Sequence, residues 1–162
     1  MCMVYYIGSQ RPLPLIKAQD WKKVDKKEGW ELEVVPFSVE ELDETNEKVK
    51  ENFSHPYVYY VGSYQGCGCG FADCVITGDD DVDPTEYDFR ASIRSRQLLH
   101  DYLKENRIDS LYGCWSGDES VAAENKTDLN LEKILDVEFG FDERTFYTIK
   151  ANEDEPADSG NG

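Results

Sequence analysis

Three of the five cysteines lie close together in a glycine-rich segment of the chain. Cys67, Cys69 and Cys74 fall within eight residues, and glycines alternate with the first two in the run Gly66–Gly70. Thiolates at this spacing can share one Zn²⁺ ion, although a structural zinc site more often repeats a pair with two intervening residues. His55 or Cys114 could complete the ligand set if the fold brings either one close. A zinc site on Cys67, Cys69 and Cys74 is therefore one open hypothesis.

A second hypothesis gives the same segment nucleophilic chemistry. Successive backbone N–H groups in a glycine loop can bind an anion and lower the pKa of a thiol. Cys67 or Cys69 would then act as the nucleophile of a cysteine-dependent enzyme, with His55 or His100 as the imidazole partner. Cys2 is a less favoured nucleophile, because it would need its own α-amino group as base after removal of Met1.

A third interpretation assigns no chemistry to the segment. The glycines would permit a tight connection, and the cysteines would be small apolar fillers. The run Gly66–Gly70 is not a dinucleotide-binding fingerprint, because its third glycine comes one residue too early and no helix follows directly. An odd number of cysteines and the lack of an export signal predict free thiols rather than a disulfide framework.

A pair of carboxylates at the end of another predicted strand is a further candidate. Asp118 and Glu119 follow the strand that ends at Trp115. Loops after strand ends often carry functional side chains, and two carboxylates could bind a cation or transfer protons. A simple turn is the commoner explanation of such a pair.

The chain is strongly acidic, with a net charge of −17. This charge argues against binding to nucleic acids and to anionic membrane surfaces, which need basic patches. No apolar run is long enough to span a bilayer, so we expect a soluble cytoplasmic protein. Residues 57–89 contain no Lys or Arg, whereas Arg90, Arg94, Arg96, Lys104 and Arg107 follow closely. Such asymmetry keeps a protein soluble or attracts a basic protein partner.

Alternating and aromatic-rich runs predict the strands. The clearest are 3–7, 57–61, 111–115 and 145–150, and weaker signals cover 30–37 and 71–77. Ser38 followed by Glu41 resembles a capping box and predicts a helix to about Asn52. Asp83 and Pro84 predict the start of a second helix, which should end near Asn106–Arg107. Residues 131–137 suit either a short helix or a strand.

These elements predict an α+β fold with a mostly antiparallel sheet and about two helices. The order of the elements is also compatible with a ferredoxin-like split β-α-β arrangement to which later strands are appended. The length suits a single domain over residues 1–150. Residues 151–162 lack large apolar side chains and predict a disordered acidic tail.

Three blocks of the sequence resemble a small family of bacterial proteins that has no established activity. The blocks are Phe53–Ser63, Gly66–Phe71 and Leu111–Glu119, and members of the family also open with a short strand after Met-Cys. The resemblance covers most of residues 1–150 and implies a bacterial, cytoplasmic setting. It transfers no catalytic role to any residue.

Together these observations favour a small binding protein whose functional surface joins the Gly62–Phe71 loop to the Cys114–Glu119 segment. The candidate binding or thiol residues are Ser63, His55, Cys67, Cys69, Cys114, Asp118 and Glu119. The ligand would be a metal, a small molecule or a protein. The alternatives are the cysteine-dependent enzyme described above and an acidic inhibitor that presents carboxylates to a basic partner.

Overall fold

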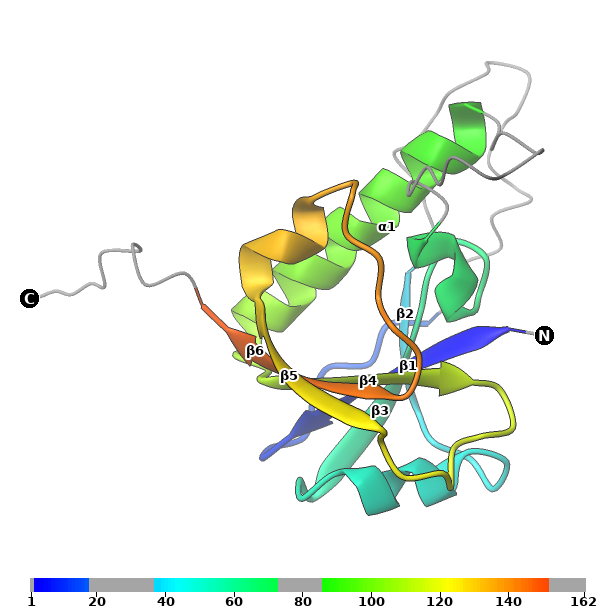
Figure 1. Cartoon of the computed structure of the whole chain (residues 1–162), viewed down its shortest axis with the longest axis vertical. Coiled ribbons are helices and arrows are strands. Elements are labelled where there is room, and N and C mark those ends of the chain that lie inside the picture. The colour runs from blue at the N-terminus through cyan, green and yellow to red at the C-terminus, as the bar shows by residue number, and fades with distance from the viewer. Residues whose placement is uncertain (1, 18–36, 73–85, 152–162) are drawn as a thin grey trace, which may run out of the picture.

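A mixed six-stranded sheet forms the centre of the protein (Figure 1). The computed structural model describes residues 2–17, 37–72 and 86–151. Across the sheet the strands lie in the order β2-β3-β1-β4-β6-β5. Their bounds are β1 Met3–Ser9, β2 Ser38–Glu41, β3 Tyr57–Gly62, β4 Ser110–Trp115, β5 Asn125–Asn130 and β6 Thr145–Lys150.

The sheet is mostly antiparallel, as the sequence predicts. Only the pairing of β5 with β6 is parallel, and the four other neighbouring pairs are antiparallel. Strands β3 and β4 both run antiparallel to β1, which lies between them, and the long helix α1 (Glu86–Glu105) connects them along the chain. This connection forms one split β-α-β unit, and the fold class is α+β.

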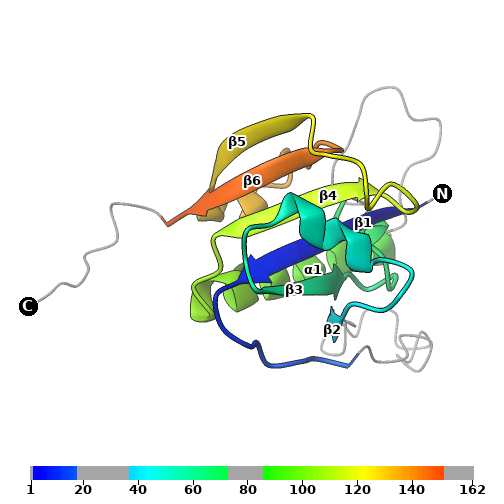
Figure 2. The same cartoon turned by 90° about the horizontal axis from the view of Figure 1, so that it is seen from below.

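Strand β1 has side chains buried on both of its faces. Tyr5 and Ile7 belong to the apolar cluster that includes α1, whereas Val4 and Tyr6 belong to the cluster on the opposite face. Alternate side chains of a strand point to opposite faces, so β1 supplies aromatic and aliphatic groups to both clusters. Figure 2 shows α1 behind the sheet and a short helix in front of it.

Helix α1 packs one apolar stripe against the sheet. Ala91, Leu99 and Leu103 are no more than 1% exposed, and they recur at helical spacing. The helix ends at Glu105, and Arg107 two residues later has a left-handed φ of 53°. The end predicted near Asn106–Arg107 is therefore confirmed. The predicted start at Asp83 and Pro84 lies outside the described residues. No helix in the described part of the chain is long and apolar enough to cross a membrane.

The helix predicted from Ser38 is wrong. Residues Ser38–Glu41 form strand β2, and only Glu47–Asn52 are helical, as a short 3₁₀ helix (η3). Val39 is fully buried, pairs with Val61 of β3 and exchanges two backbone hydrogen bonds with Ile16. These sheet contacts outweigh the local capping signal, and the Ser38 hydroxyl has no hydrogen-bond partner among the described residues.

Three other elements differ from the sequence pattern or refine it. Phe71 is the last residue of a 3₁₀ helix, η4 (Gly68–Phe71), so the strand predicted over 71–77 does not begin there. Of the rest of that predicted strand, only Ala72 belongs to the described residues. Leu131–Leu135 is helical (η5), which decides between the two predicted forms. Strand β5 was not predicted, because its side chains are polar and mostly exposed. Residues 30–36 and the tail 152–162 also lie outside the described part.

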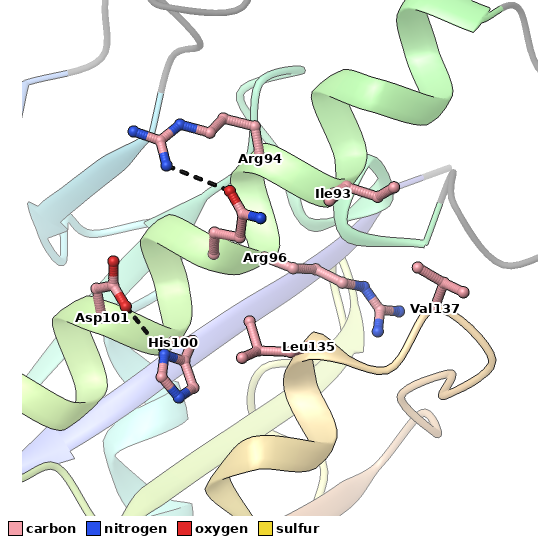
Figure 3. A pocket seen from close by; sticks show the side chains of 8 residues that line it. Ile93, Arg94, Arg96, His100, Asp101, Leu135 and Val137 are labelled. Carbon is pink, nitrogen blue, oxygen red and sulfur yellow. Dashed lines mark hydrogen bonds and ion pairs between the residues drawn. The ribbon is translucent and has the colours of Figure 1, made fainter.

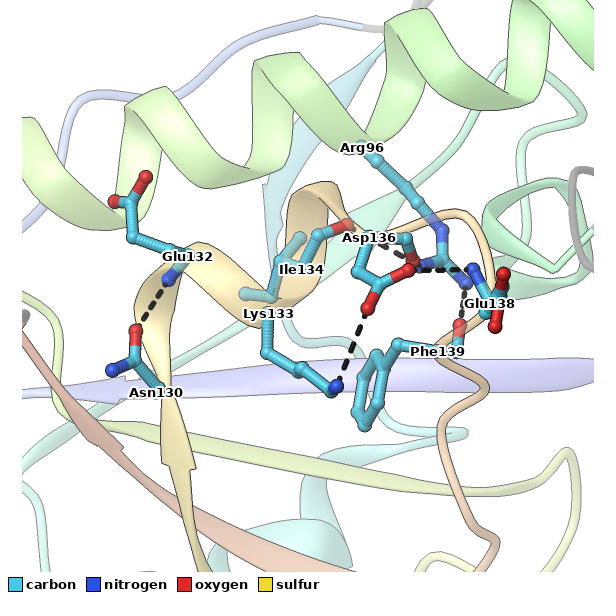
Figure 4. A network of polar contacts seen from close by, with 8 residues as sticks. All are labelled: Arg96, Asn130, Glu132, Lys133, Ile134, Asp136, Glu138 and Phe139. Atoms are coloured by element: carbon cyan, nitrogen blue, oxygen red, sulfur yellow. Dashed lines mark hydrogen bonds and ion pairs between the residues drawn. The ribbon is translucent and has the colours of Figure 1, made fainter.

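One buried arginine joins α1 to two distant segments of the chain. Arg96 is 1% exposed, and its guanidinium donates to four backbone carbonyls. Figure 4 shows its position beside Ile134, Asp136 and Phe139. A buried cation needs such partners, because desolvation without them is costly. The acceptors are Phe71 O at 2.6 Å, Ile134 O at 3.2 Å, Asp136 O at 3.0 Å and Phe139 O at 2.5 Å. The guanidinium also lies 5.5 Å from the centre of the Phe141 ring, within cation–π distance.

We predict that Arg96→Met lowers the free energy of unfolding by about 3–5 kcal/mol, because it leaves several buried carbonyls without donors. Urea denaturation of the full chain measures this change. Arg94→Met is the matched control, since Arg94 lies half-buried on the same helix and bonds to Gln97, an exposed contact. The control should stay within about 0.5 kcal/mol of the unmodified protein. Equal losses in the two variants would contradict a special role for Arg96.

Candidate functional site

The cysteine segment lies at the N-terminal end of β1. Strand β1 begins between the C-terminal ends of β3 and β4, where Met3 pairs with Trp115. The backbone N–H of Ser116 donates to the carbonyl of Cys2 at 2.8 Å, which anchors Cys2 at this edge. The start of β1, the loop after β3 and the loop after β4 therefore lie next to one another at this end of the strands.

The loop after β3 is held in a tight turn by Ser63 and Tyr60. The Ser63 backbone N–H and hydroxyl both donate to the carbonyl of Cys67, at 2.9 and 2.5 Å. The Tyr60 hydroxyl donates to the carbonyl of Gly66 at 2.5 Å. Gly66 has a φ of 87°, which favours glycine over residues with a side chain. Ser63, a candidate binding residue, therefore shapes the loop through these bonds.

Gly68, the next glycine in the loop, allows the loop to pack closely against β1. A Cβ atom on Gly68 would overlap the Tyr5 ring and lie 2.9 Å from the Met3 carbonyl oxygen. Only glycine fits this close approach without displacing β1 or its aromatic side chain. The contact places Cys67 and Cys69, on either side of Gly68, beside the first residues of β1.

This packing brings three thiols together. The Sγ atoms of Cys2, Cys67 and Cys69 all lie within 4.8 Å of one another. Cys2 is exposed, whereas Cys67 and Cys69 are half-buried. The Met3 backbone N–H donates to Cys69 Sγ at 3.3 Å. We refer to these three residues as the thiol cluster.

Sequence reasoning did not assign Cys2 to this cluster. Cys2 is 65 positions from Cys67 along the chain, and the pairing of β1 with β3 and the packing of Gly68 against β1 bring them together. The predicted partner Cys74 lies outside the described residues, so its role as a ligand stays a prediction. The alternating glycines are the local signal for this packing, because Gly68 makes the approach to β1 sterically feasible.

The thiol of Cys67 is difficult to ionise in the metal-free protein. Burial raises its pKa to about 12, and the adjacent side chains of Cys69 and Cys2 add to this effect. A hydrogen bond from the Cys69 backbone acts in the opposite direction but is outweighed. Cys67 is therefore protonated at neutral pH, whereas a nucleophilic cysteine needs a lowered pKa.

Cys114 does not join the thiol cluster. Its side chain is fully buried in the apolar cluster that contains Val4, Tyr6 and Tyr112. Burial raises the pKa of its thiol to about 12, and the nearby charge of Glu119 adds to the increase. Cys114 thus packs the face of the sheet opposite α1, as a small apolar side chain.

The two carboxylates after β4 are already bonded within the protein. Asp118 accepts from Arg144 at 2.9 Å. Glu119 is 7% exposed and accepts from the Tyr6 hydroxyl at 3.0 Å and the Gly117 N–H at 2.9 Å. Burial and the charge of Glu119 raise the pKa of Tyr6, so the phenol stays a donor. These contacts form a closed turn beside Cys2.

Neither histidine contacts any of the four cysteines that the structure describes. His55 lies at the opposite end of β3 from the cysteine segment, with Nε2 3.1 Å from Asp109 and 2.9 Å from the Ser110 hydroxyl. Asp109 and Ser110 are both nearest to Nε2, although the Ser110 hydroxyl also lies 3.5 Å from Nδ1, and this hydroxyl donates to Asp109 as well. A catalytic triad instead places the acid and the nucleophile on different nitrogens. His100 bonds to Asp101 and Glu132. The Cys–His pair expected for an enzyme does not form, and His55 does not complete a metal site with Cys67 and Cys69.

A groove of about 310 Å³ lies between α1 and η5, and none of the described residues that line it is a cysteine (Figure 3). Leu135 and Val137 form its apolar side. Arg94 and His100 face it from α1, and they bond to Gln97 and Asp101 beside it. The predicted site residues Cys67 and Cys69 thus lie in the thiol cluster and not at this groove.

Comparisons of the chain with models of known families, with curated proteins and with solved structures found no significant match. The resemblance of the three sequence blocks to a bacterial family stays an expectation. The geometry of the thiol cluster is therefore the observation from which a function follows.

We predict that Gly68→Ala lowers the free energy of unfolding by about 1–3 kcal/mol, because the added methyl group overpacks the contact with Tyr5. It should also spread the three thiols, so that a bifunctional thiol reagent such as a trivalent arsenical binds more weakly. Gly140→Ala is the control, since a Cβ there meets no atom within 4 Å. Unchanged stability and unchanged arsenical binding in Gly68→Ala would show that the close approach does not position the thiols.

Proposed function

We propose that this protein binds a thiophilic metal ion, Zn²⁺ in the first instance, through Cys2, Cys67 and Cys69. The proximity of three thiol sulfurs from two distant segments carries this proposal. Thiolate sulfur is the preferred protein ligand of Zn²⁺ and Cu⁺. A binding protein is also the function class that the sequence favoured, although the ligand set now excludes Cys114 and includes Cys2.

The spacing of the sulfurs is close to that of a coordinated ion. Zinc–sulfur bonds of about 2.3 Å in a tetrahedral site separate the sulfurs by about 3.8 Å. The three sulfurs lie within 4.8 Å of one another, so small rotations about the Cα–Cβ bonds bring them into range. Three thiolates leave a fourth position of the tetrahedron for another ligand.

The electrostatics of the cluster support a cation better than they support a free thiolate. The hydrogen bond from Met3 to Cys69 and the one from the Cys69 backbone to Cys67 both favour negative sulfur. Burial and the adjacent thiols nevertheless keep Cys67 protonated. A divalent cation removes this conflict, because it compensates the charge of the thiolates. The overall charge of −17 also raises the local concentration of cations.

We predict that replacing any one of the three cysteines by alanine weakens zinc binding by more than about 100-fold. Removing a residue that only hydrogen-bonds to a metal ligand already lowers metal affinity about 10–100-fold, and loss of the ligand itself should cost more. Competition with a chromophoric chelator measures the affinity. Titration with Co²⁺ reports on the ligands directly, through the near-ultraviolet sulfur-to-cobalt absorption. This absorption should fall in each variant.

The matched control is Cys114→Ala, which removes a buried cysteine outside the cluster. It should bind zinc with unchanged affinity once circular dichroism has confirmed that it folds. The proposal fails if the unmodified chain binds no zinc. It also fails if Cys114→Ala and Cys69→Ala lose affinity to the same extent.

Zinc affinity should increase with pH, because zinc must displace the proton of Cys67. The thiol with a pKa of about 12 is protonated throughout the neutral range, so each displaced proton makes affinity rise about tenfold per pH unit. Chelator competition between about pH 6 and pH 8 measures the slope, which should be smaller in Cys67→Ala. An affinity that does not change with pH would contradict the assignment of Cys67.

A further inference from the structure

We propose that the thiol cluster is a redox-controlled site, in which a hydroperoxide joins Cys2 and Cys67 in a disulfide and expels the bound ion. This inference rests on the proposed metal site and adds a mode of regulation to it. It follows from the unequal exposure of the three thiols and from the contacts that Cys67 makes with the other two.

Cys2 is the sulfur that an oxidant reaches first. It is exposed, whereas Cys67 and Cys69 are half-buried. Oxidation of a cysteine follows its exposure and is reversible when a second thiol stands next to it. The bond from Ser116 to the Cys2 carbonyl holds the backbone of Cys2 beside the loop. The exposed thiol thus has its resolving partners within 4.8 Å.

Cys67 is the resolving thiol that the contacts favour. Its side chain contacts that of Cys2, and the two Sγ atoms lie within 4.8 Å of each other. Cys69 is held by the Met3 N–H at 3.3 Å. A bridge between Cys67 and Cys69 would have to close across Gly68, which the Tyr5 ring and the Met3 carbonyl fix in place. Disulfides tolerate little departure from their geometry, so this bridge is disfavoured.

The reaction balances with one hydroperoxide per disulfide. The sulfur of Cys2 attacks the peroxide, so that an S–O bond forms, the O–O bond breaks and the departing oxygen leaves as water or an alcohol. The sulfur of Cys67 then attacks the sulfur of the sulfenic acid, an S–S bond forms, and hydroxide departs. In the zinc-loaded chain both sulfurs are thiolates, so solvent supplies the two protons that the two departing oxygens take up. Two electrons pass from the two sulfurs to the peroxide. Zinc stays divalent and leaves, because two of its three ligands are no longer thiolates.

The test treats the zinc-loaded full chain with hydrogen peroxide. A chromophoric chelator records released zinc, and mass spectrometry of the unreduced peptides identifies the bridge. We expect one zinc released per chain, a peptide that links Cys2 to the segment with Cys67, and full rebinding of zinc after reduction. Cys114→Ala should behave as the unmodified chain does.

The metal-free variants identify the resolving cysteine and separate the two proposals. In metal-free protein the bridge to Cys2 should form in Cys69→Ala and be lost in Cys67→Ala. Zinc that binds but stays bound under peroxide overturns the redox inference and leaves the metal site standing. A bridge between Cys67 and Cys69, or sulfinic acid without a bridge, also overturns it. A chain that binds no zinc, with or without a bridge, overturns the metal site and with it the release of an ion.

Discussion

The hydrogen bonds of Arg96 connect the cysteine segment to the rest of the fold. The guanidinium holds the carbonyl of Phe71, the last residue of η4, and at the same time holds carbonyls of η5 and of the chain after it. Buried backbone carbonyls must find donors, and one rigid cation here serves segments that share no strand or helix. The position of η4 against β1, and therefore of Cys67 and Cys69, depends on this contact.

A second constraint completes the site from the other side. The backbone at Gly68 lies against Tyr5 and Met3 of β1, and β1 supplies side chains to both apolar clusters. Ligands at the end of a strand that is buried on both faces are held in place by that packing, as a preorganised site requires. The exposed Cys2 belongs to the same strand end but lies at the surface. The cluster thus combines two sulfurs that the loop holds in place with one that solvent reaches.

The local patterns of the sequence predicted the elements that have strong local signals. The strands with aromatic and β-branched residues, such as β3, and the apolar stripe of α1 were visible because burial dictates those residues. Ser38–Glu41 was misassigned because a capping signal is local, whereas the pairing of Val39 with β3 is not. Strand β5 carries no apolar pattern, since most of its side chains face solvent. Arg96 was indistinguishable from its exposed neighbours, because nothing local separates a buried arginine from a surface one.

The central claim is that Cys2, Cys67 and Cys69 bind the same ion. X-ray absorption at the zinc edge of the zinc-loaded full chain tests it most directly, because it reports the element and distance of each ligand. A site on all three cysteines should give a sulfur shell at about 2.3 Å that holds at least three sulfurs and loses one in Cys2→Ala. A shell of nitrogen or oxygen alone at about 2.0–2.2 Å, or a sulfur shell that Cys2→Ala leaves unchanged, would contradict it.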